Sequence, residues 1–175
     1  KQCNRKAADL LGITITKDIK GIDVSEHQGV IDWKKVKASG IEYAVIRAGY
    51  GKGNEDKHFV RNITEALRAG IHVSVYWFMY SYTTAMAKAE AEYCMKLIAP
   101  WKDAIAVVFA DWEYDSINYA KKNKVSPSKN LITAMNKEFC EAVKKSGYTA
   151  GVYYNYDYKA NHMKLSELPY VNWYL

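Results

Sequence analysis

Cysteine is scarce in this sequence, and its spacing argues against two common ways of holding a fold together. The 175 residues contain three cysteines, Cys3, Cys94 and Cys140, and no C-x-x-C pair. An odd number without paired spacing disfavours both a disulfide framework and a thiolate metal cluster. Cys94 and Cys140 stand beside apolar residues within helical patterns, so we expect buried thiols. Nothing in the sequence places a histidine beside a cysteine as the base that a nucleophilic thiol would need.

Long apolar runs are also missing. No stretch approaches the roughly 18 apolar residues that a membrane-spanning helix needs. The first residues, Lys1 to Leu11, do not show the charged, apolar and small-residue regions of a signal peptide. The sequence does not begin with methionine, so we expect a processed or excised chain whose missing export signal says little about where it acts. We expect a soluble protein with no membrane partner.

Acidic residues are fewer than basic ones, 19 against 25, which gives a formal net charge of +6 and a pI of about 9.0. This balance would favour an anionic polymer such as nucleic acid, an acidic membrane surface or a bacterial wall. Nine of the 21 lysines, however, occupy predicted helical positions, where a solvated surface is the simpler explanation. Neither a zinc-finger spacing nor an RNA-binding aromatic signature is present. We therefore predict that nucleic acid is not a partner.

Short β-rich runs alternate with helical patterns, which is typical of βα repeats around a parallel sheet. The predicted strands are Gly21–Ser25, Tyr43–Gly49, His72–Tyr80, Ile105–Glu113, Gly151–Tyr156 and Val171–Leu175. The predicted helices are Asp32–Ser39, His58–Ala69, Thr84–Ile98 and Ser128–Ser146. The residues that end them are Gly40, Gly70, Pro100 and Gly147. The sequence therefore predicts an α/β fold, and its length and apolar content suffice for one core.

The expected domain organisation is a short lead-in followed by one barrel. Residues 1–19 resemble a helical lead-in or a linker, and residues 20–175 carry the βα units. An eight-stranded α/β barrel usually needs about 250 residues and seldom fewer than about 200. The sequence also stops within the apolar run Asn172–Leu175. We therefore expect a TIM-like (β/α) barrel that is irregular or lacks its last strands in this chain.

Three carboxylates follow one apolar strand in the segment Ile105–Asp115. Barrel strands end at the face where catalysis occurs. Because side chains alternate along a strand, Asp111 and Glu113 should share one side, about 6.6–7 Å apart along the backbone, with Trp112 opposite. Repulsion and partial burial would raise one pKa, which leaves a protonated acid beside an ionised partner, as glycosidic cleavage requires. Alternatively, the two acids cap the next segment or pair with surface lysines.

Asp23 ends the first predicted strand and could reach the same barrel mouth. Considered alone, it would more simply be a turn or capping residue. Together with Asp111 and Glu113 it makes a set of strand-end carboxylates that is harder to explain structurally. The sequence therefore predicts these three acids as the chemical centre.

Aromatic side chains gather at the same strand ends. Tyr76, Phe78 and Tyr80 share one parity on the third predicted strand, and Tyr153 lies on the fifth. Sugar-binding clefts use such flat faces, but barrels also fill their interiors with bulky side chains, so both explanations stay open. Asn155 has the parity of Tyr153 and could bind a sugar hydroxyl or acetamide, or satisfy backbone. The same two explanations, cleft or core, apply to Trp33, Trp77, Trp101 and Trp173.

Four stretches of the sequence carry a resemblance to a known family. They are GIDVSEHQGVIDWKKVKASGIEYAVIRAGYG, DKHFVRNITEALRAGIHVSVYWF, FADWE and GYTAGVYYN. From about Lys20 to its end, the chain resembles the glycoside hydrolase family 25 lysozymes. The opening GIDVS-x-x-QG-x-IDW block and the later D-x-E strand end have the order and spacing of that family.

The resemblance implies an N-acetylmuramidase that cleaves the β-1,4 bond between N-acetylmuramic acid and N-acetylglucosamine, without cofactor or metal. It implies Glu113 as general acid and Asp111 as the group that orients the 2-acetamido group of the substrate. That acetamide would act as internal nucleophile, with retention of configuration. Asp23 matches a strand-one active-site aspartate of the family, and Tyr76 and Tyr153 match cleft tyrosines.

The sequence departs from the family after Trp173. Family members usually continue into further strands with a late active-site aspartate, so the alternative is a non-catalytic cell-wall glycan-binding module. A chitinase-like enzyme is disfavoured because the residues before Asp111 do not complete a D-x-x-D-x-D-x-E pattern. The resemblance also implies bacterial peptidoglycan as partner, an extracellular or cell-wall location and a wall-binding domain in the parent protein.

Overall fold

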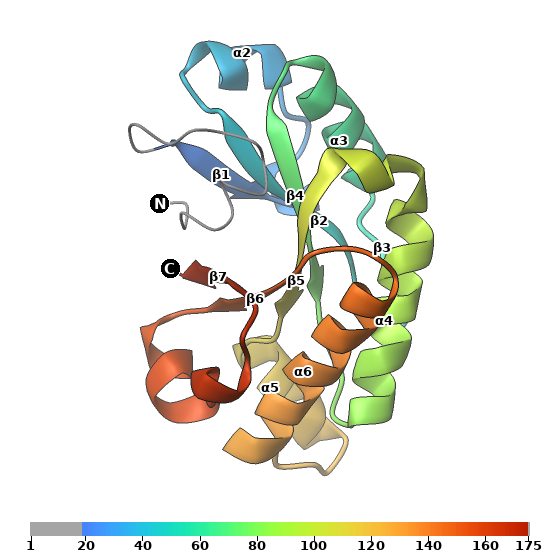
Figure 1. Cartoon of the computed structure of the whole chain (residues 1–175), viewed down its shortest axis with the longest axis vertical. Helices are drawn as coiled ribbons and strands as arrows, with labels where there is room; N and C mark the ends of the chain where they lie inside the picture. The colour runs from blue at the N-terminus through green and yellow to red at the C-terminus, as the bar shows by residue number, and fades with distance from the viewer. Residues whose placement is uncertain (1–18, 175) are drawn as a thin grey trace.

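A curled parallel sheet forms the centre of the computed structural model, which describes residues 19–174 (Figure 1). Its strands pair in the order β1-β2-β4-β5-β6-β7, and a short β3 pairs antiparallel with β2. The bounds are β1 (Gly21–Val24), β2 (Tyr43–Tyr50), β3 (Asn54–Glu55), β4 (His72–Phe78), β5 (Ile105–Asp111), β6 (Ala150–Tyr154) and β7 (Val171–Tyr174). The predicted lead-in, apart from its last residue, and Cys3 lie outside the described residues.

Helices cover the outer side of this sheet, where α3, α4 and α6 run along it (Figure 1). The helices are α2 (Trp33–Ala38), α3 (Phe59–Arg68), α4 (Thr84–Ile98), α5 (Tyr114–Lys122) and α6 (Lys129–Lys145). Shorter helical turns are η1 (Glu26–Gln28), η2 (Ala99–Ala104), η3 (Tyr158–His162) and η4 (Leu165–Glu167). Because β1 and β7 are the two ends of the described sheet, the fold is a partial (β/α) barrel. The prediction of an α/β, TIM-like and incomplete barrel is confirmed.

The four predicted helices all form, and local signals mark both ends of three of them, whereas α3 begins at His58 without a side-chain cap. Side chains of Asp32, Thr83 and Ser128 accept hydrogen bonds from backbone N–H groups three residues further on, at 3.1–3.2 Å. After α2, α3 and α6 the chain turns at Gly40, Gly70 and Gly147, each with positive φ. After α4, Pro100 lies in the first turn of η2, two residues beyond Ile98.

One helix next to the predicted acids was not predicted. β5 ends at Asp111, two residues before the predicted end, because α5 begins at Tyr114 with Glu113 as its N-cap. Its buried residues are the small Ser116 and Ala120, so its apolar periodicity is weak. The strand β4 likewise ends at Phe78, not at Tyr80.

Two hydrophobic clusters occupy the two faces of the sheet. The alternation along β2 directs Ala44 and Ile46 to the larger outer cluster beneath the helices, and Tyr43 and Val45 to the smaller inner one. Buried residues of the inner cluster are Ile19, Tyr43, Val45, Tyr76, Val107, Phe109 and Val171. Cys94 and Cys140 are free and buried in the outer cluster, as predicted. None of the helices described is long and apolar enough to cross a membrane.

Candidate active site

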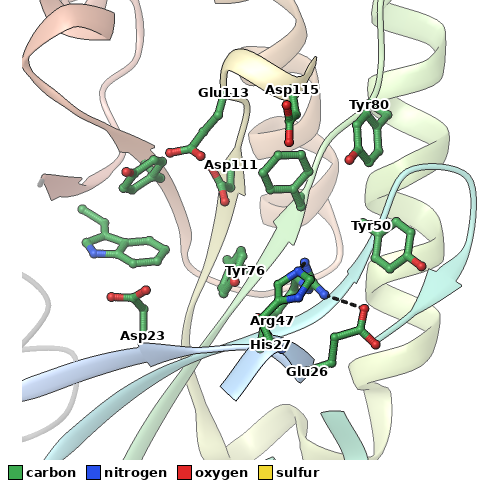
Figure 2. Close-up of a pocket in the computed structure, with 14 residues that line it drawn as sticks. Asp23, Glu26, His27, Arg47, Tyr50, Tyr76, Tyr80, Asp111, Glu113 and Asp115 are labelled. Carbon is green, nitrogen blue, oxygen red and sulfur yellow. Dashed lines mark hydrogen bonds and ion pairs between the residues drawn. The ribbon is translucent and has the colours of Figure 1, made fainter. Parts of the chain in front are cut away.

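A pocket of about 470 Å³ opens on the inner face, at the carboxyl ends of the strands (Figure 2). Parallel strands bring their carboxyl ends to one edge, which is why residues far apart in sequence meet here. The lining residues are Asp23, Ser25, Glu26, His27, Arg47, Tyr50, Tyr76, Phe78, Tyr80, Asp111, Glu113, Asp115, Tyr153 and Trp173. The pocket therefore brings together every predicted site residue except Asn155.

The three predicted acids are among the five carboxylates that line this pocket, and they face it from two directions. Figure 2 shows Asp111 and Glu113 side by side at the end of β5, and Asp23 across the space on β1. Trp112, between the two neighbouring acids, is fully buried in the outer cluster, as the predicted alternation requires. Glu113 is both the N-cap of α5 and a lining residue, so the capping and the pocket interpretations hold together. Within residues 19–174, no group of three or more His, Cys, Asp or Glu side chains could hold a metal ion.

Asp111 is the more deeply buried acid of the pair. The residue is only 5% exposed, and its Oδ1 is buried without a hydrogen-bond partner among the residues described. Burial raises the pKa of Asp111 well above its ordinary value, the charges of Glu113 and Asp23 raise it further, and Arg47 partly opposes this. Asp111 is therefore an acid that holds its proton unusually well and has an unused acceptor.

Glu113 is half-buried and also holds its proton better than an isolated carboxyl. Burial raises its pKa, a hydrogen bond from the Tyr153 hydroxyl lowers it, and the charges of Asp115 and Asp23 raise it again. The sequence predicted a raised pKa for one acid of the pair, and in the structure the pKa values of both Asp111 and Glu113 are raised. Because the two acids influence each other, they titrate as a pair that retains a proton more readily than separate carboxyls.

A buried arginine, Arg47, also lines the pocket, and the sequence analysis did not predict it. Arg47 donates from Nε to Asp56 Oδ2 at 2.8 Å and from a terminal nitrogen to Glu26 Oε1 at 2.9 Å. His27 Nε2 lies 3.5 Å from the other terminal nitrogen (Figure 2). Asp56 is fully buried and accepts further backbone hydrogen bonds from Glu26 and His58, each at 2.9 Å. One sequence signal could have identified Arg47 as a pocket residue. It is the single cation in the apolar strand YAVIRAGY, at a position that strand alternation directs to the inner face.

Aromatic rings make a third wall. Trp173 on β7 packs on Tyr76, Phe109 and Tyr153, with ring centroids 5.5, 5.5 and 4.7 Å apart. Tyr76 belongs to the inner cluster and also lines the pocket, so the core and cleft explanations both apply to it. For the two tryptophans Trp33 and Trp77, the core explanation is confirmed.

Asn155 lies outside the residues that line the pocket. Its Oδ1 accepts a hydrogen bond at 2.9 Å from the backbone N–H of Tyr158, at the start of η3. The amide thus satisfies backbone, which was one of the two predicted roles. Its role as a sugar ligand stays a prediction.

Comparison with known proteins points to one family. The family model described as glycosyl hydrolases family 25 matches residues 22–173. Lysozyme M1 from Streptomyces globisporus is 37% identical over 83 residues, which make up 47% of this chain and 28% of that protein. The family model thus covers most of the barrel, and the pairwise match covers just under half of the chain.

Solved structures agree with this match. The modular autolysin LytC from Streptococcus pneumoniae has a TM-score of 0.76 at 29% identity, covering 89% of this chain and 37% of that one. A family 25 glycosyl hydrolase from Bacillus anthracis has a TM-score of 0.69 at 23% identity, covering 92% and 68%. The chain thus spans well under half of the length of LytC, 37%, and of Lysozyme M1, 28%.

Proposed function

The chain belongs to the glycosyl hydrolases of family 25, and on that premise we propose that it is a muramidase. It would cleave the β-1,4 bond between N-acetylmuramic acid and N-acetylglucosamine in bacterial peptidoglycan. The observation that carries this proposal is the pair Asp111 and Glu113, two acids with raised pKa at the mouth of one pocket. The names of the relatives, a lysozyme and an autolysin, support the same substrate.

Glu113 is the proposed general acid. A carboxyl can protonate a leaving glycosidic oxygen only if it still carries a proton at the working pH, and burial raises the pKa of Glu113 in that direction. Of the two paired acids it is also the more accessible, so its oxygens can reach a bound substrate. After the first step the resulting carboxylate can take a proton from the attacking water.

Asp111 is the proposed partner of the substrate acetamide. Its buried Oδ1 lacks a hydrogen-bond donor within the described chain, and an acetamide N–H would supply one. That hydrogen bond favours the ionised form of Asp111, so the proton of the pair would rest on Glu113 when substrate is bound. The acetamide oxygen then bonds to the anomeric carbon as the bond to the leaving oxygen breaks, which closes a second ring on the sugar. Water attacks the same carbon and opens this second ring, with net retention of configuration.

Asp23 and the aromatic wall complete the proposed site. Asp23 faces the acid pair across the pocket, where its negative charge would stabilise the positive charge that develops on the sugar. Tyr76, Tyr153 and Phe78 present apolar faces on which a pyranose ring can pack. The predicted chemistry uses no cofactor and no metal, because acid, base and nucleophile are supplied by Glu113 and the substrate.

The proposed place of action is the bacterial cell wall, outside the cytoplasm. Peptidoglycan is the proposed partner, and a wall-binding domain in the parent protein is proposed because LytC is a modular autolysin. The net charge of +6 would help the chain approach anionic wall polymers. Increasing salt should then weaken wall binding by screening.

The test is release of new reducing ends from purified peptidoglycan by the chain and by its Glu113→Gln variant. We expect muramic acid at the new ends, a loss of at least about a hundredfold in the variant, and unchanged thermal unfolding. Glu92→Gln, an exposed change on α4, is the matched control. NMR of the first product anomer tests retention. If the folded chain binds wall and releases nothing, the glycan-binding alternative replaces the enzyme.

A further inference from the structure

A second pocket, of about 950 Å³, adjoins the proposed catalytic one and has no role in the chemistry above. We name it the lysine pocket. Its lining residues are Tyr50, Gly51, Lys52, Asn54, Tyr80, Asp115, Asn118, Tyr119, Lys121 and Lys122. Tyr50, Tyr80 and Asp115 line both pockets, so a ligand can pass continuously from one to the other.

The charge of the lysine pocket is opposite to that of its neighbour. Lys52 comes from the turn between β2 and β3, and Lys121 and Lys122 come from the end of α5, against one acid, Asp115. All three lysines are exposed, and none forms an ion pair within residues 19–174. The catalytic pocket, by contrast, is lined by five carboxylates. A ligand that crosses both pockets should therefore be anionic at the lysine end.

Tyrosine rings form a continuous path from the shared edge toward these lysines. The ring centroids of Tyr50 and Tyr80 are 6.4 Å apart, and those of Tyr80 and Tyr119 are 5.1 Å apart. Tyr119 is 42% exposed, although it packs on two other rings, so its face is available to a ligand. Such rings offer contact area with little loss of side-chain entropy on binding.

The turn that carries Lys52 is held in place by the sheet. Gly51 donates from its N–H to Phe78 O at 2.9 Å, and its carbonyl accepts from Trp77 Nε1 at 3.2 Å. Gly51 also has positive φ, and a Cβ there would lie 3.1 Å from the Tyr80 ring. The turn is therefore a fixed wall, which is what a binding site needs.

We propose that the lysine pocket binds the carboxylates of the peptide stem carried by muramic acid, and so makes stem-bearing peptidoglycan the preferred substrate. This inference rests on the proposed function. The stem is attached to the sugar whose glycosidic bond is cleaved, so it must leave the catalytic pocket through an adjoining space. It carries free carboxylates at several positions, and flexible lysines can follow such variation as point charges. Without the stem, muramic acid keeps only the single carboxylate of its lactyl group, close to the sugar ring, and lacks the more distant carboxylates of the stem.

The test compares two forms of one substrate: soluble peptidoglycan chains with stems, and the same chains after an amidase has removed them. The variant is K52Q/K121Q/K122Q. Its control is K96Q/K137Q/K145Q, three exposed lysines of α4 and α6 that line neither pocket and lose the same charge. Direct binding of both chains is measured in a Glu113→Gln background, where substrate persists.

We expect the lysine-pocket variant to raise KM and Kd for stem-bearing chains about tenfold at low salt, with a much smaller change on stripped chains. The control should leave the preference for stems intact. Equal losses on both chains would assign the lysines to the glycan, and no loss on either would remove the site; both overturn the proposal. Stronger competition by a phosphate-containing wall polymer than by free stem peptide would also overturn it. Absence of turnover in the parent chain would contradict the muramidase proposal alone. The Kd measurements on stem-bearing and stripped chains would still decide whether the lysine pocket binds the stem.

Discussion

The Arg47 guanidinium is fixed by the fully buried Asp56 carboxylate, with Nε and Oδ2 2.8 Å apart. This contact connects the inward face of β2 to the segment that leads into α3. Arg47 in turn contacts Glu26 and approaches His27, so one buried ion pair orients an entire wall of the proposed catalytic pocket.

We predict that Asp56→Asn lowers the free energy of unfolding by about 2 to 3 kcal/mol, because it removes the fully buried carboxylate beside Arg47 and leaves Glu26 as the remaining acidic partner of that charge. Denaturant unfolding monitored by tryptophan fluorescence measures the change. Glu65→Gln removes the exposed ion pair with Arg68 and should have little effect. A loss for Asp56→Asn as small as that of Glu65→Gln would show that Arg47 finds other partners.

A second prediction concerns the hydroxyl that contacts the proposed acid. Tyr153→Phe removes a hydrogen bond that lowers the pKa of Glu113, so that pKa should rise. The alkaline limb of the kcat/KM profile, where the acid loses its proton, should therefore move to higher pH. Tyr156→Phe, at an exposed tyrosine outside the pocket, is the control. An alkaline limb that stays in place would mean that Tyr153 does not tune Glu113.

Glu90 on α4 should make stability depend on pH. Burial raises its pKa from 4.5 to about 8, although Trp77 Nε1 and the Tyr80 N–H both donate to its Oε2 at 3.2 Å. Since the unfolded state loses this proton first, the free energy of unfolding should fall by about 1.4 kcal/mol per pH unit between these two values.

The Glu90 prediction is tested by the difference between the parent chain and Glu90→Gln, measured from pH 4 to pH 9 by denaturant unfolding. Glutamine keeps the acceptor oxygen but cannot ionise, so its curve should lack this contribution to the slope. Other raised acids, such as Asp111, contribute to both curves and cancel in the difference. Glu92→Gln, exposed on the same helix, should follow the parent curve. Parallel curves for Glu90→Gln and the parent would contradict the prediction.

Gly49 tests how tightly β2, β3 and β4 are packed. A Cβ at this position would lie 2.2 Å from Asn54 O and 2.6 Å from Trp77 Cζ3, so backbone would have to move. We predict that Gly49→Ala costs about 3 kcal/mol of unfolding free energy. Gly21→Ala is the matched strand control, because its Cβ would meet Tyr43 Cδ1 at 3.1 Å, a milder contact. Equal losses in thermal or denaturant unfolding would show that the clash is relieved cheaply.

Helices with strong end signals were predictable from the sequence, and the weakly patterned one was not. α2 and α6 carry capping side chains at one end and glycine after the other, so local chemistry sets their bounds. α5 has a buried face of small residues, and its first turn is fixed by a long-range hydrogen bond from Ser116 Oγ to Met79 O at 2.6 Å. Tertiary contacts, which no local pattern records, therefore decide that element.

For the site, the alternation of side chains along strands predicted which acids would meet. Ion pairs between residues on different elements could not be predicted from the sequence. Asp23, Asp111 and Glu113 follow from strand parity and from the rule that parallel strands end together. The partnership of Arg47 with Asp56 depends on how the turn after β2 folds back, which spacing alone does not encode. Asn155 shows the converse case, since correct parity did not bring its side chain into the pocket.

The separation of the two hydrophobic clusters by the sheet matters for anyone who wishes to make this protein more heat-resistant. Tyr76 belongs to the inner cluster and also forms part of the pocket wall, so repacking there would move groups around the reacting bond. The outer cluster under α4 and α6 faces away from that wall. Thermostabilising substitutions chosen beneath those helices can accumulate without trading turnover for melting temperature, whereas the same effort on the inner face would meet that trade-off at once.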